Sequence, residues 1–63
     1  MQFKVPTIDS SESASQLKKT ILTSEPNAKV EVDSDSKTVT IDSEASEETF
    51  KQLIIAAGHK LNS

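Results

Sequence analysis

Histidine is the residue type that ordinarily changes charge near neutral pH, and this 63-residue sequence contains one, His59. It is the first candidate for proton transfer or metal ligation. A single imidazole is nevertheless a weak basis for a metal site, because zinc sites supply at least three protein ligands. The sequence has no cysteine, so it can form no thiolate site, no disulfide and no cysteine nucleophile.

The segment Asp33-Ser34-Asp35-Ser36 carries two carboxylates two residues apart, a spacing found in calcium-binding loops. Such a loop also needs further oxygen ligands, a glycine at its sharp bend and a distal glutamate. None of these follows here. The segment is therefore predicted to be a hairpin turn.

The overall charge argues against several kinds of partner. The net charge is −3 and all seven basic residues are lysine, with no basic stripe for phosphate contacts and no arginine clamp for anions. No apolar run approaches membrane-spanning length, and the N-terminus lacks an apolar signal-peptide core. We expect a cytoplasmic protein that binds neither nucleic acid nor membranes, folded as a single domain over residues 1–63.

Four short stretches have the composition of strands. Two of them alternate polar and apolar residues strictly, which indicates strands with one buried face. The four predicted strands are Gln2–Val5, Ala28–Asp33, Lys37–Asp42 and His59–Asn62, the last with Leu61 in the core.

Two segments have helical periodicity. The first runs from about Ser11 to Thr23, and Asp9 with Glu12 fits a capping box at its start, with Ser10 and Ser13 as competing caps. The second begins after Ser43 or Ser46 and ends at Gly58. The predicted buried stripes are Ala14, Leu17 and Ile21 in the first helix and Phe50, Leu53, Ile54 and Ala57 in the second.

The element order is strand, helix, strand, strand, helix, strand. It predicts an α+β protein with the ferredoxin-like βαββαβ fold, in which both helices cover one face of a four-stranded antiparallel sheet.

The stretch Val5-Pro6-Thr7-Ile8-Asp9-Ser10-Ser11-Glu12-Ser13-Ala14 resembles the N-terminal loop of heavy-metal-associated domains, in particular the small bacterial copper chaperones. The pattern of that family is Val-Pro-Thr-Ile-x-Cys-x-x-Cys-Ala. The ending Ala56-Ala57-Gly58-His59 extends the resemblance to essentially the whole chain. Both cysteine positions hold serine, through either natural divergence or deliberate substitution.

The resemblance implies that Ser10, Ser13 and His59 stand at inherited ligand positions around a Cu(I) site. It also implies docking on the soluble metal-binding domains of copper-transporting ATPases. Cu(I) is a soft ion that selects thiolate and thioether donors, and a serine hydroxyl is hard and neutral. No cofactor is therefore expected, and metal transfer is predicted to be lost.

Three other functions are considered. The first is a metal-independent interaction or structural domain. The second is a site for zinc, nickel or Cu(II), in which Asp9 and Glu12 add oxygens to His59. The third is a hydrolase built on the serines and His59, which is disfavoured because so short a chain offers no deep pocket. We expect no enzyme.

Overall fold

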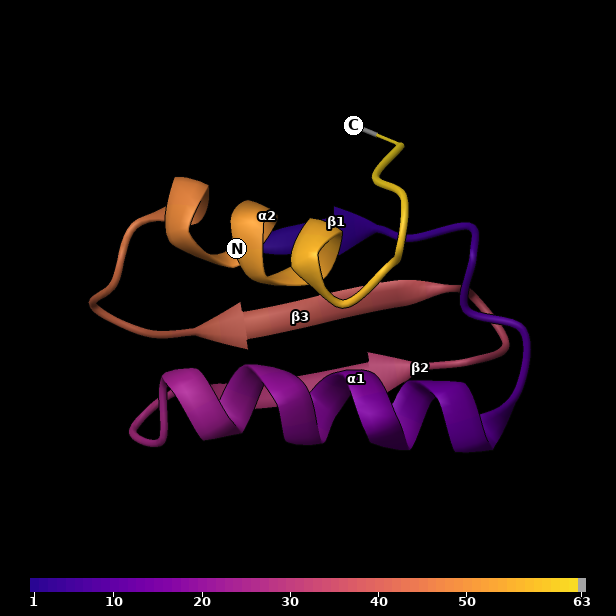
Figure 1. The fold of residues 1–63 in the computed structure, drawn as a ribbon, viewed down its shortest axis with the longest axis horizontal. Helices are drawn as coiled ribbons and strands as arrows, with labels where there is room; N and C mark the ends of the chain where they lie inside the picture. The colour runs from indigo at the N-terminus through magenta and orange to yellow at the C-terminus, as the bar shows by residue number, and fades with distance from the viewer. Residues whose placement is uncertain (63) are drawn as a thin grey trace.

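The computed structural model describes residues 1–62. It contains a three-stranded antiparallel sheet in the order β1–β3–β2 and two helices. α1 packs against both β2 and α2, and both helices contribute to one core against one face of the sheet (Figure 1). None of the helices within residues 1–62 is long and apolar enough to span a bilayer.

The strands are β1 (Gln2–Lys4), β2 (Lys29–Asp33) and β3 (Thr38–Asp42). The central strand β3 pairs with β1 through Phe3 opposite Val39 and with β2 through Val30 opposite Ile41. These four side chains are buried while their neighbours along each strand are more exposed, as the strict alternation predicts.

The helices are α1 (Ser11–Ser24) and α2 (Glu47–Ala56). The stripe of α1 is buried as predicted, with Leu17 and Ile21 at most 1% exposed. In α2, Phe50 and Ile54 are fully buried and Leu53 packs at the edge of the core. Helical periodicity therefore located the core correctly in α1 and, apart from Ala57, in α2.

The end of α2 differs from the prediction at Ala57, which is exposed rather than buried. The helix ends at Ala56 and Ala57 is its cap residue. Gly58 follows at φ +91°, and the N–H groups of Gly58 and His59 donate to the carbonyls of Ile55 and Ile54. This is a Schellman motif, which only glycine enters without strain. The chain turns away before Ala57 can complete the stripe.

The predicted fourth strand is wrong, because His59–Asn62 forms no strand in the described part of the chain. The backbone N–H of Asn62 donates to the Lys4 carbonyl of β1 at 2.9 Å, but the N–H of Lys60 donates to the Thr7 hydroxyl instead of to a strand. Leu61 still packs against the core, half-buried. A side chain has thus taken a backbone donor that a ladder requires, and the sheet has three strands.

Candidate functional site

The candidate site lies at the N-terminus of α1, where Ser10 is the N-cap residue and Ser13 is the third residue of the helix. The Ser10 hydroxyl accepts a hydrogen bond from the Ser13 N–H at 3.1 Å. The Ser13 hydroxyl accepts from the N–H groups of Asp9 at 3.1 Å and Ser10 at 3.4 Å, and it donates to the Ser10 carbonyl at 3.2 Å. The two hydroxyls therefore accept the backbone N–H groups of Asp9, Ser10 and Ser13 between them.

This arrangement corrects the predicted capping box. The pair is Ser10 with Ser13, not Asp9 with Glu12, and both acidic side chains are exposed. Ser10 has an extended backbone (φ −162°, ψ 166°), which directs its short hydroxyl at the amide three residues on. A carboxylate at Asp9 lies one residue too early for that geometry.

The loop between β1 and α1 is held by buried apolar side chains and by hydrogen bonds to Lys37. Val5 and Ile8 are fully buried, and the Ile8 N–H donates to the Val5 carbonyl at 3.1 Å. Lys37, in the turn between β2 and β3, accepts the Val5 N–H on its carbonyl at 2.8 Å and donates its ammonium group to the Ile8 carbonyl. Lys37 holds a left-handed backbone (φ 57°), unusual for a residue other than glycine. The hairpin turn therefore braces the loop that carries the serines.

His59 reaches the same loop from the opposite end of the chain. Its Nδ1 atom lies 2.7 Å from the hydroxyl of Thr7, which also accepts the Lys60 N–H at 3.1 Å. Both Thr7 and His59 are half-buried. The imidazole is thus held beside the loop through Thr7, and no hydrogen bond within residues 1–62 joins it to Ser10 or Ser13.

The donor chemistry of this region does not match a soft metal ion. Within residues 1–62, no three histidine, aspartate or glutamate side chains gather closely enough to hold a metal. The two serine oxygens are hard, neutral and already hydrogen-bonded, whereas Cu(I) requires sulfur. The residues present do not fit a copper site.

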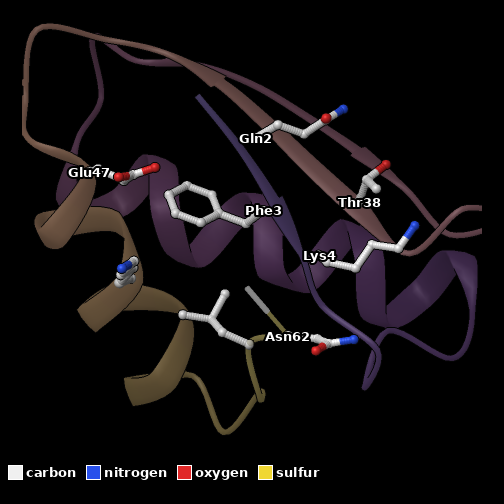
Figure 2. A pocket seen from close by; sticks show the side chains of 8 residues that line it. Gln2, Phe3, Lys4, Thr38, Glu47 and Asn62 are labelled. Carbon is white, nitrogen blue, oxygen red and sulfur yellow. The ribbon is translucent and has the colours of Figure 1, made fainter.

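A separate hollow lies elsewhere on the surface. A hollow of about 430 Å³ opens between β1, the first half of α2 and the C-terminal segment, where a fourth strand would otherwise cover the edge of β1. Figure 2 shows Phe3 and Glu47 at this hollow with Asn62 on its far side. Its lining includes none of Ser10, Ser13 and His59, so it is not part of the candidate site.

Comparison with protein families assigns the architecture. The model of the heavy-metal-associated domain matches residues 2–60. The chain belongs to the heavy-metal-associated domain family. No curated protein sequence matches it significantly.

Solved structures agree with this assignment. The copper chaperone Atx1 from Synechocystis PCC6803, in a trimeric His-to-Tyr mutant form, is 35% identical with a TM-score of 0.90, and the alignment covers 98% of each chain. A cyanobacterial copper metallochaperone, ScAtx1, is 37% identical with a TM-score of 0.79 over 98% of this chain and 97% of that one. A gold binding protein is 31% identical with a TM-score of 0.89 over 98% of both. The heavy-metal-associated fold is therefore present although the sequence holds no cysteine.

Two residues of this region received no role from sequence alone. Thr7 belongs to the family-like stretch, but its hydrogen bonds to His59 and Lys60 join positions 52 and 53 residues apart. Lys37 gave no signal either, since a left-handed turn position is ordinarily read from glycine or asparagine.

Proposed function

We propose that this chain is a heavy-metal-associated domain that has retained the scaffold of a copper chaperone but does not carry Cu(I). The observation that supports the proposal is the hydrogen bonding of Ser10 and Ser13. Each hydroxyl at a position where the family pattern has cysteine is engaged at the helix start, and no thiolate donor exists in the chain. The domain then acts by docking, without chemistry of its own, and residues 1–63 form one domain.

The proposed partner is a soluble metal-binding domain of a copper-transporting ATPase, met in the cytoplasm. The resemblance supplies this partner class, and the structural matches to copper chaperones support it. A second candidate is a metal-independent interaction domain with some other partner. The half-exposed Ile55 (51% exposed), next to exposed Ala56 and Ala57, favours it by offering an apolar surface just before His59.

An anaerobic Cu(I) titration against a chromogenic chelator tests the proposal. The unmodified protein should bind Cu(I) no more tightly than a peptide that contains one histidine, because neither supplies a thiolate. The double variant Ser10→Cys/Ser13→Cys should bind Cu(I) tightly with an unchanged fold. Tight stoichiometric binding by the unmodified protein would overturn the proposal.

The second helix offers a matched control. Ser46 and Thr49 have the same spacing at the start of α2, so Ser46→Cys/Thr49→Cys places two thiols on an ordinary helix N-terminus. The pair in α1 should bind Cu(I) at least about tenfold more tightly, because its loop is already held by Lys37 and Thr7. Equal affinities would show that the loop is no inherited metal site.

A further inference from the structure

Within residues 1–62, the side-chain hydrogen bonds between the C-terminal segment and the loop before α1 are those of Thr7. Its hydroxyl oxygen lies 3.1 Å from the backbone nitrogen of Lys60 and 2.7 Å from Nδ1 of His59. The first of these contacts has a fixed direction, because a backbone N–H can only donate. The second depends on which atom carries the proton.

Counting donors and acceptors indicates the direction of the second bond. A threonine hydroxyl has one proton and two acceptor positions, and Lys60 uses one acceptor. If the hydroxyl donates to His59 Nδ1, its proton is used. If Nδ1 donates instead, the hydroxyl proton has no partner within residues 1–62.

We infer that Thr7 is a positioning residue that donates its hydroxyl proton to Nδ1 and so holds neutral His59 in the tautomer with its proton on Nε2. Since Nε2 has no partner within residues 1–62, this nitrogen is presented as a hydrogen-bond donor. A docking protein would meet it with an acceptor, such as a carbonyl or carboxylate oxygen. Ligation of a metal ion through Nε2 would first require the proton to leave it.

This inference rests on the proposed function, a domain that docks without carrying Cu(I), because it states which hydrogen-bonding group His59 offers to a docking protein. Its test needs no metal. His59 is the only histidine, so a long-range ¹H–¹⁵N correlation spectrum in mildly alkaline solution reports on it alone. The unmodified protein should show a pyridine-type shift for Nδ1 and a pyrrole-type shift for Nε2.

Substitution of Thr7 tests its role in positioning the ring. Thr7→Val should move both nitrogen shifts toward values averaged over the two tautomers and make the Lys60 amide exchange about tenfold faster, because both hydrogen bonds are lost. Thr7→Ser keeps the hydroxyl and should retain both signatures. Thr20→Val, on the exposed side of α1, is the matched control and should change neither.

Two results would overturn the inference. One is a pyrrole-type Nδ1 in the unmodified protein, a measurement that requires no variant to fold. The other is a folded Thr7→Val protein with unchanged histidine shifts and unchanged Lys60 exchange. The copper titration remains independent, since tight Cu(I) binding would refute the proposed function without altering the tautomer in the metal-free protein.

Discussion

The two helices of this molecule carry hydroxyl side chains at the same two positions of their starts, the N-cap and the third helical residue. Ser10 and Ser46 are the N-cap residues, and each accepts the N–H of the third helical residue, at 3.1 Å from Ser13 and 3.2 Å from Thr49. The residue that follows in each helix is buried, Ala14 in α1 and Phe50 in α2. One start lies where the family pattern has its cysteines, and the other has no counterpart in that pattern.

The difference between the starts lies in the second hydroxyl. In α1, Ser13 reaches back to the amides of Asp9 and Ser10, whereas in α2 Thr49 pairs with the Ser46 hydroxyl at 2.9 Å. The Ser13 hydroxyl therefore satisfies two backbone donors that would otherwise need water, whereas within residues 1–62 the Thr49 hydroxyl satisfies none. The serines of the family loop thus do what hydroxyls do at an ordinary helix start, which supports a structural role for them.

Among substitutions that test the comparison of the two helix starts, the largest effect is expected at Phe50, a buried residue of α2. Phe50→Ala should lower the free energy of unfolding by about 3–5 kcal/mol, because it leaves a large cavity under the first turn. That loss is comparable with the whole stability of a small domain. Urea unfolding followed by circular dichroism measures it, and a loss below about 1 kcal/mol would contradict the core assignment.

Ile55 on the same helix is the control for Phe50. It is 51% exposed, so Ile55→Ala should change the free energy of unfolding by no more than about 0.5 kcal/mol. The contrast between these two positions separates the loss of core packing from any general weakening of α2.

The caps provide the direct test of equivalence. Ser10→Ala and Ser46→Ala each remove one acceptor for a helix-end amide, and each should cost about 0.5–2 kcal/mol of unfolding free energy. If both serines are ordinary caps, the two losses in parallel urea titrations should agree within about 0.5 kcal/mol. A stabilising Ser10→Ala, beside a costly Ser46→Ala, would instead reveal a strained loop kept for some function.

The sequence located most of the fold because its signals are local. Alternation along Lys29–Asp33, the stripe of Leu17 and Ile21, and the glycine after α2 each depend on residues within a few positions of one another. The fourth strand was wrong for the opposite reason. Its loss depends on Thr7, 53 residues before Lys60, and no local pattern shows that a side chain will take a ladder donor.

The sequence likewise predicts only part of the candidate site. The grouping of Ser10, Ser13 and His59 came from a family resemblance and stays a prediction as a set of ligand positions. The sequence predicts the reciprocal Ser10–Ser13 cap only in part, because both serines are cap candidates but Asp9 with Glu12 fits the same spacing equally well. Only the backbone angles at Ser10 decide between them.

A third oxygen cap, in the hairpin turn, shows what a charge adds to this arrangement. The Asp33 carboxylate accepts the backbone N–H groups of Asp35 at 2.9 Å and Ser36 at 3.4 Å, and these bonds, chiefly the one from Asp35, hold the pKa of Asp33 below its ordinary value. A lowered folded-state pKa gives stability that is fully present above the unfolded value of about 3.9 and is lost as the pH falls through the folded value.

Asp33→Asn keeps an acceptor oxygen without the charge, so the difference in urea midpoint between the unmodified protein and this variant should be constant above about pH 5 and shrink in more acidic solution. Asp35→Asn removes one charge from the same turn as a control, whereas the uncharged caps at Ser10 and Ser46 should show no such acid dependence. A difference between the Asp33→Asn and unmodified proteins that stays constant down to about pH 2 would mean that Asp33 acts as a neutral cap, as the serines do.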